Sequence, residues 1–145
     1  MKKYISKLQK WRFTLNKKLS ITKVQTAFND AIRRRDHFCR VRDERPCSGG
    51  LQCSHFYPVG SNNSLRFYPH NAYGQCAGHH LSHHNRNPAF YCRWITETYP
   101  EQVDFMESHR HKTIKYSQDV LKTIYGFCIT DNLTDLEDFI RSLLK

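Results

Sequence analysis

Histidine, asparagine and cysteine side chains gather between residues 39 and 84 of the chain. His55 ends a short strand-like run, Leu51 to His55, and an imidazole with a pKa near ~6.5 can take a proton from water at neutral pH. Asn71 carries amide donors and a carbonyl acceptor, so it can tie the loop before a helix to a strand and hold such a base. His80 can ligate a divalent cation that grips a scissile phosphate. These residue types suit metal-assisted hydrolysis.

Cysteine and histidine spacing predicts a second metal, a structural zinc ion. Cys76 and His79 are separated by two residues and can supply half of a tetrahedral site, and Cys39 with Cys47 can supply the other half. Cys53 competes for the fourth position. Because it precedes the expected base by two residues on the same strand, it shares that residue's face, which favours a packing role.

Four histidines follow Cys76 on one polar, helix-like segment. His79 and His80 point roughly 100° apart on a helix, so they can serve two different metals. His84 lies one turn beyond His80 and is expected to bind the same divalent cation. His83 lies one turn beyond His79 and can approach the zinc.

Several phrases of the sequence match one family. They are Ile32 to Asp36, Gln52 to Phe56, Leu65 to Phe67 with Pro69 and Asn71, Gln75 with Cys76, and Tyr91 after Asn87-Pro88. Through them, residues 31 to about 103 resemble the phage NinG (Rap) recombination-nuclease family and related phage HNH endonucleases. The resemblance implies a ββα-metal (His-Me finger) core with a structural Zn²⁺ and a catalytic Mg²⁺, Mn²⁺ or Ni²⁺. It also implies cleavage of DNA, including branched recombination intermediates, in the cytoplasm of a bacterial host.

The chain also departs from that pattern. Many HNH enzymes have a metal-binding aspartate before the base, and here that place holds Ser54, a neutral and weaker ligand of the catalytic cation. His79 replaces the family's second downstream cysteine, which keeps zinc chemistry. The upstream knuckle is stretched, because Arg42 follows Cys39 by three residues and the next cysteine is Cys47.

Arginines are the expected DNA contacts. Arg33, Arg34 and Arg35 fan around the end of a helix just before the zinc knuckle, so at most two of them can face one partner, and Asp36 can pair with one. Arg66 is expected on a second short strand, Leu65 to Tyr68, where its planar guanidinium can clamp a phosphate. The alternatives for Arg66 are a snorkelling side chain or a pair with an acid such as Asp36.

Charge and cysteine usage limit the class of protein. The 145 residues include 23 Lys and Arg against 13 Asp and Glu, a formal charge of +10, which favours a polyanionic partner such as nucleic acid. No apolar run serves as a signal core or a membrane span, so a reducing cytoplasm and metal-bound rather than disulfide-bonded cysteines are expected. Cys92 and Cys128 lie outside the cluster and are expected to be buried.

Segments with helical periodicity are expected before and after the cysteine and histidine cluster. Lys2 to Leu19 predicts an amphipathic helix with lysines on one side, and Ser20 or Thr22 can cap a second helix that ends at Asp36. Further helices are expected after Asn87-Pro88, from about Glu101, and after a capping box at Thr134. The predicted fold is α+β: residues 1–36 are basic helices, 37–100 the ββα-metal core and 101–145 C-terminal helices, all in one compact domain.

Two other functions fit the same composition. One is a noncatalytic, zinc-stabilised DNA-binding protein of a phage, in which Ser54 marks a decayed site. The other is a structural phage protein that is basic only to associate with nucleic acid. A junction-resolving enzyme needs two active sites, which favours a homodimer.

Overall fold

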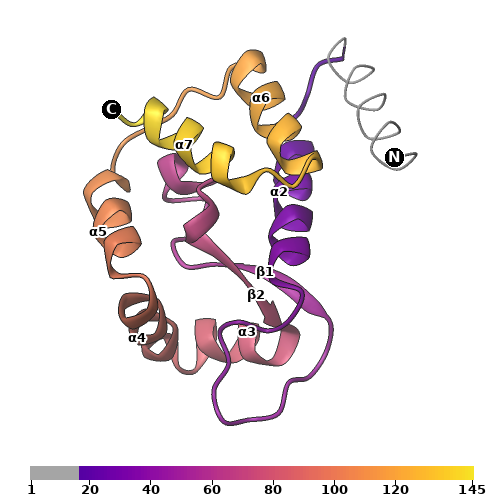
Figure 1. Cartoon of the computed structure of the whole chain (residues 1–145). Helices are drawn as coiled ribbons and strands as arrows, with labels where there is room; N and C mark the ends of the chain where they lie inside the picture. Colours follow the sequence, from indigo (N-terminus) through magenta and orange to yellow (C-terminus); the bar gives the residue numbers. More distant parts are fainter. Residues whose placement is uncertain (1–16) are drawn as a thin grey trace.

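A central β-hairpin is surrounded by helices in the computed structural model, which describes residues 17–145 (Figure 1). Over these residues the fold is mixed α+β. The elements are α2 (Ile21–Asp36), β1 (Leu51–His55), η1 (Asn63–Leu65), η2 (Pro69–Asn71), β2 (Ala72–Cys76), α3 (Ala77–Asn85), α4 (Pro88–Thr98), α5 (Pro100–His109), α6 (Gln118–Ile129) and α7 (Leu133–Leu143). Most of the predicted helix from Lys2 to Leu19 lies outside the described residues.

Helix α2 forms as its sequence predicts. The Ser20 side chain caps it by accepting a hydrogen bond from the Lys23 backbone N–H. Its buried side chains follow helical spacing: Val24, Phe28, Ala31, Ile32 and Asp36. The helix ends at His37, which adopts a left-handed conformation with φ of 62°.

The second strand is not where the sequence predicted it. β1 pairs antiparallel with residues 72–76, with Leu51 opposite Cys76 and His55 opposite Ala72. Leu65 to Tyr68, predicted as that strand, instead lie at the end of η1 and in the turn after it. Apolar side chains at 65, 67 and 68 reflect burial within turns, and Pro69, the first residue of η2, has no N–H for a ladder. All of β2 is buried, so it shows no alternating pattern.

A buried carboxylate joins α2 to the hairpin. Asp36 accepts hydrogen bonds from the Gly74 backbone N–H at 2.7 Å and from Arg35 Nε at 2.7 Å. A Cβ at residue 74 would lie 3.1 Å from both the Asp36 Cβ and the Phe38 carbonyl oxygen, so glycine allows this close approach. Arg35 also donates to the carbonyl oxygens of Pro69 and Ala72.

The C-terminal helices differ from prediction in detail. α7 begins after Asn132, whose side chain accepts from the Asp135 backbone N–H, so the predicted cap at Thr134 is wrong. Helix α6 was not foreseen as a separate element. Cys128 is buried on it as expected, whereas Cys92 is exposed, because α4 turns that side outward. None of the described helices is both long and apolar enough to cross a membrane.

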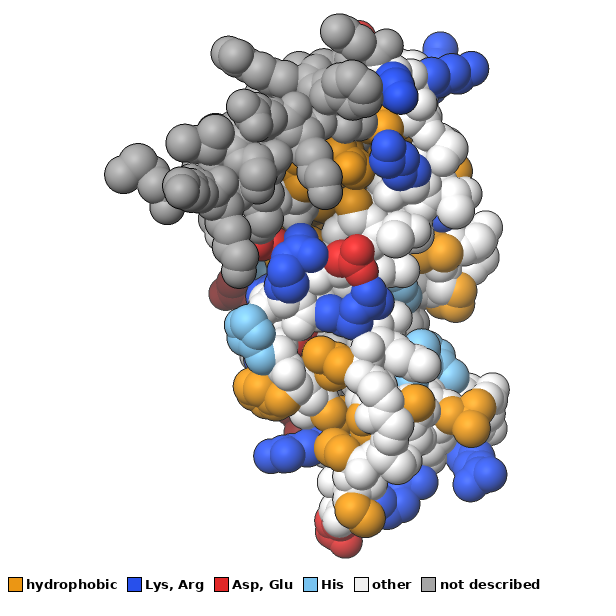
Figure 2. Space-filling view, turned by 90° about the vertical axis from the view of Figure 1, so that its right-hand side faces the viewer, with side chains coloured by type: hydrophobic (Ala, Val, Ile, Leu, Met, Phe, Trp, Pro, Cys, Tyr) orange, Lys and Arg blue, Asp and Glu red, His pale blue; other side chains and the backbone are white. Residues whose placement is uncertain are grey.

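One hydrophobic cluster includes buried residues of α2, η1 and the turn after it, β2 and helices α4 to α7. Its members come from all three predicted sequence regions, so the described parts of these regions share a core. Figure 2 shows the face on the α2 side of the molecule, where Lys and Arg side chains are spread from top to bottom with histidines between them.

Candidate functional site

The site is built where β2 passes directly into α3. Cys76 is both the last residue of β2 and the N-cap of α3, and its sulfur accepts from the His79 backbone N–H. Helix α3 then presents its histidines on two faces. His79 and His83 are buried, while His80 is partly buried and His84 is exposed. His79 and His83 therefore lie on a different face of α3 from His80 and His84.

Four side chains form a compact group suited to zinc. The ligand atoms of Cys39, Cys47, Cys76 and His79 all lie within 4.8 Å of one another. From His79 Nδ1 the sulfur atoms of Cys76, Cys39 and Cys47 are 3.1, 3.5 and 3.7 Å away. A tetrahedral zinc ion holds bound sulfur and nitrogen about 3.5 Å apart, so this Cys₃His set fits the ion. Cys47 fills the fourth position, and Cys53 is not in the group.

The loop before β1 brings two of these ligands to α3. Ala77 N–H donates to the Gly50 carbonyl and Gly78 N–H to the Ser48 carbonyl, both at 3.0 Å. Gly49 has φ of +74°, and a Cβ there would lie 2.8 Å from the Ala77 Cβ. The stretched knuckle therefore closes onto the helix N-terminus.

The local environment prepares Cys76 for metal binding. Burial raises the pKa of its thiol, but hydrogen bonds from the backbone of His79 and Ser48 outweigh burial and lower this pKa to about 6. Cys76 is then mostly thiolate at neutral pH, the form that binds zinc. Burial raises the pKa of Cys39 to about 12, so its proton must leave when a metal binds.

The predicted ligands of the catalytic cation meet on the other side of α3. Ser54 Oγ lies 3.0 Å from His84 Nε2, and Gln52 Oε1 lies 2.6 Å from His80 Nδ1. The rings of His80 and His84 are 4.8 Å apart. Burial lowers the pKa of both imidazoles, and a neighbouring histidine lowers each further, so both favour the neutral form that can bind metal. His80 and His84 also line a cavity of about 400 Å³.

His55 lies at the end of β1 with an unsatisfied nitrogen. Its ring stacks on Phe28 of α2, with ring centres 5.8 Å apart. Burial is the main cause that lowers the pKa of His55 to about 4; the nearby side chains of Arg66, His80 and His84 contribute to this lowering, and a hydrogen bond with the Arg66 backbone opposes it. Nε2 of His55 is buried and has no hydrogen-bond partner within residues 17–145. This nitrogen is a free base at neutral pH.

Asn71 holds the chain that follows this base. Its side-chain oxygen accepts from the Tyr57 backbone N–H at 2.8 Å, and its amide donates to the carbonyls of Tyr57 and Leu65. Its own carbonyl accepts from the Phe56 N–H. These bonds tie the start of β2 to the chain that follows β1.

The four arginines predicted to contact DNA differ in their exposure and in their partners. Arg35 is committed to interior contacts and stacks on Tyr73, which corrects the expectation that it faces DNA, because the buried Asp36 requires a counter-charge. Arg33 pairs with Asp30, and Arg34 with Asp131, at partly exposed positions. Arg66 is the C-cap residue of η1 and does not lie on a strand as predicted. It donates hydrogen bonds to the Gln25 side chain and to the Val59 carbonyl, and its Nε is buried with no partner in the described chain.

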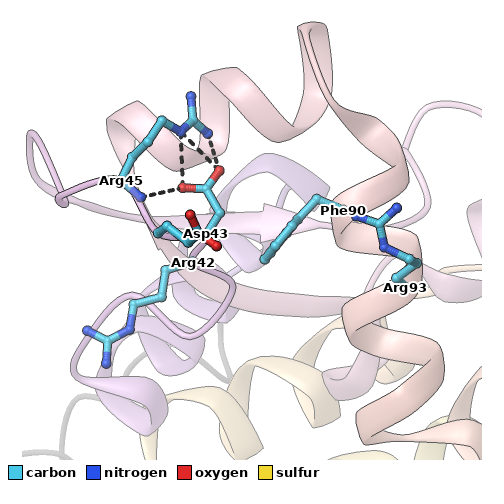
Figure 3. Close-up of a pocket in the computed structure, with 6 residues that line it drawn as sticks. Arg42, Asp43, Arg45, Phe90 and Arg93 are labelled. Atoms are coloured by element: carbon cyan, nitrogen blue, oxygen red, sulfur yellow. Dashed lines mark hydrogen bonds and ion pairs between the residues drawn. The ribbon is translucent and has the colours of Figure 1, made fainter.

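Asp43 was not among the site residues predicted from the sequence. Its carboxylate lies 3.0 Å from His79 Nε2 and 3.1 Å from His83 Nε2. Figure 3 shows it beside a cavity of about 610 Å³, with Arg45 folded over it and the guanidinium groups of Arg42 and Arg93 directed away. Hydrogen bonds from Arg45 hold the pKa of Asp43 well below its usual range. The only feature of the sequence that could have identified Asp43 is its position between two predicted zinc ligands, Cys39 and Cys47.

Comparison with known protein families relates the chain to a phage family. The family model described as Bacteriophage Lambda NinG protein matches residues 2–133. No curated protein and no solved structure matches the chain significantly.

Proposed function

The chain belongs to the bacteriophage lambda NinG protein family, and from this premise and the geometry around α3 we propose that it is an HNH-type, metal-dependent DNA endonuclease. The observation that carries the proposal is the buried, unpartnered Nε2 of His55 at the end of the strand that also bears Ser54. An unsatisfied buried polar atom lowers stability, so a purely structural role does not explain this nitrogen.

His55 would act as the general base. With a pKa lowered to about 4, chiefly by burial, it is neutral at physiological pH and can accept a proton from the attacking water. Stacking on Phe28 and the hydrogen bond with the backbone of Arg66 fix the ring. Asn71 holds the chain just beyond it. The base is thus oriented before DNA binds.

His80, His84 and Ser54 would hold the divalent cation. Two neutral imidazoles one turn apart, with a hydroxyl 3.0 Å from one of them, form a donor set suited to Mn²⁺, Ni²⁺ or Mg²⁺. When bound, the cation supplies charge that stabilises the leaving oxygen of the phosphodiester. Gln52 keeps the His80 ring in place through its side-chain oxygen.

Positive charge supports DNA as the substrate. The chain has a formal charge of +10, and Lys and Arg side chains are spread over the face in Figure 2. Arg66 lies beside the base at a partly exposed position, so its planar guanidinium would be available to a phosphate oxygen. We extend the proposal to branched recombination intermediates, cut by a homodimer that supplies two active sites.

Cleavage of plasmid and branched DNA, with and without Mg²⁺, Mn²⁺ or Ni²⁺, tests the function. His55→Ala should lower the cleavage rate roughly 100-fold or more while leaving DNA affinity nearly unchanged, because the base acts only in the chemical step. His111→Ala removes an exposed histidine and should cleave like the wild type.

Each outcome of this experiment decides between functions. DNA that is bound but never cut, with any of the three metals, would favour the noncatalytic DNA-binding alternative. Full activity of His55→Ala would remove His55 from the mechanism. Thermal melting of each variant shows whether lost activity reflects lost fold.

A further inference from the structure

A hydrogen-bonded chain runs from the protein interior to Nε2 of His79, while Nδ1 of the same ring faces the three cysteine sulfur atoms. It starts at the Val41 carbonyl, passes through Gln75, His83 and Asp43, and ends at His79. The metal ligands are Cys39, Cys47, Cys76 and His79, so the three side chains in the middle of this chain lie outside the ligand set.

The direction of each bond can be assigned from its first partner. A backbone carbonyl only accepts, so the Gln75 atom 2.6 Å from the Val41 oxygen is its amide nitrogen. The second hydrogen of that amide points to His83 Nδ1 at 2.7 Å. His83 Nδ1 must therefore be an acceptor, and in the neutral ring the proton sits on Nε2.

The hydrogens between His83, Asp43 and His79 are assigned in the same way. His83 Nε2–H donates to Asp43 Oδ2 at 3.1 Å, and a carboxylate can only accept, so His79 Nε2 must also donate to Asp43 Oδ1 at 3.0 Å. The Nδ1 lone pair of His79 is then left facing the three sulfur atoms. A metal-binding histidine needs this tautomer.

Asp43 is itself held in place. The Arg45 backbone N–H donates to Oδ1 at 2.9 Å, and Arg45 Nε is 3.0 Å from both carboxylate oxygens (Figure 3). The His83 ring is fixed from its other face by Phe90, with ring centres 4.5 Å apart. Neither contact involves a predicted metal ligand.

We propose that Asp43 is a positioning residue of the zinc site, which, backed by Gln75 and His83, fixes His79 as the Nε2–H tautomer so that Nδ1 binds the metal. His79 and His83 lie on the same helix as His80 and His84, so these contacts also hold the helix whose other face would carry the second cation. The proposal concerns zinc binding and does not depend on nuclease activity.

Zinc affinity of the purified full-length protein, measured by competition with a chromophoric chelator, tests the role of Asp43. Asp43→Asn should weaken zinc binding about 10- to 100-fold, because the amide keeps the shape of the carboxylate but cannot accept from both imidazoles. Glu44→Gln removes the same charge from the neighbouring exposed residue and should leave zinc affinity unchanged. Equal affinity of Asp43→Asn and the wild type would overturn the proposal.

A measurement on the wild type covers the case in which Asp43→Asn fails to fold. Long-range ¹H–¹⁵N NMR of the zinc-loaded protein reports which nitrogen of each imidazole carries the proton. We expect protons on Nε2 of both His79 and His83. Metal bound through His79 Nε2, a proton on His83 Nδ1, or a wild-type protein that binds no zinc would each contradict the assignment.

Discussion

Among the proposed ligands of the divalent cation, Ser54 is expected to bind the metal most weakly. Its hydroxyl is fully buried and lies 3.0 Å from His84 Nε2, so a ligand at this position faces the imidazole pair. A neutral oxygen binds a hard divalent cation less tightly than a carboxylate does. The cation should therefore be held loosely until DNA supplies phosphate oxygens, and Mn²⁺ or Ni²⁺ should support cleavage better than Mg²⁺.

Ser54→Asp should shift the metal requirement of cleavage to a lower concentration, because it adds a charged oxygen beside His84. A metal titration of the cleavage rate gives the midpoint for each protein. Ser61→Asp adds the same charge in an exposed loop and should leave the midpoint unchanged. Identical midpoints for Ser54→Asp and the wild type would show that residue 54 does not contact the cation.

Helix α2 and the hairpin are joined by the Arg35–Asp36 pair. Asp36 is fully buried and Arg35 is about a quarter exposed, with its guanidinium spread over three backbone or carboxylate partners. Removing the arginine leaves a buried carboxylate that, among residues 17–145, has only Gly74 N–H and the more distant Arg40 as partners. Breaking the pair in this way strongly destabilises the fold, because an uncompensated buried charge remains.

Arg35→Met should lower the free energy of unfolding by about 3 kcal/mol, measured by urea denaturation. Arg33→Met breaks a partly exposed pair with Asp30 on the same helix and should cost less than about 0.5 kcal/mol. A loss of DNA affinity without a loss of stability in Arg35→Met would restore this arginine to the DNA interface.

At the scale of the whole molecule, a polar network fastens the C-terminal helices to the core. Glu137 of α7 accepts hydrogen bonds from Tyr68 and Arg141 and pairs with His70 of η2 at 3.2 Å. Gln102 of α5 joins through Tyr68 and Arg141. The hydrogen bond from His70 is the main cause that lowers the pKa of Glu137 to about 2, below its unfolded value near ~4.3.

This pKa shift predicts an acid-dependent loss of stability. A depressed carboxyl pKa stabilises the folded protein above the unfolded pKa, and the contribution disappears as pH falls from about 4.3 toward 2. Thermal unfolding over this range should therefore show a shallower fall in Tm for Glu137→Gln than for the wild type. Glu101→Gln, at an exposed position of α5, should keep the wild-type slope. Parallel profiles for all three proteins would contradict the assigned role of Glu137.

The sequence by itself identified the residues of the candidate zinc site and much of the helical framework. Cysteine and histidine have few other reasons to recur at these spacings, so Cys39, Cys47, Cys76 and His79 could be named as ligands. Helical periodicity is also local, and it predicted the buried face of α2. Position on α3 likewise separated His80 and His84 from the zinc side.

Only the tertiary structure decided which distant residues meet. Strand β2 is buried on both faces and contains Gly74, so it carried no alternating signal, while the apolar run at residues 65–68 imitated one. Asp43 reaches His79 and His83 only because the loop folds back onto α3, and Arg35 turns inward only because Asp36 is buried beneath it. Spacing along a chain specifies a face of a helix or strand, but contacts across 30 or more residues depend on how the elements pack.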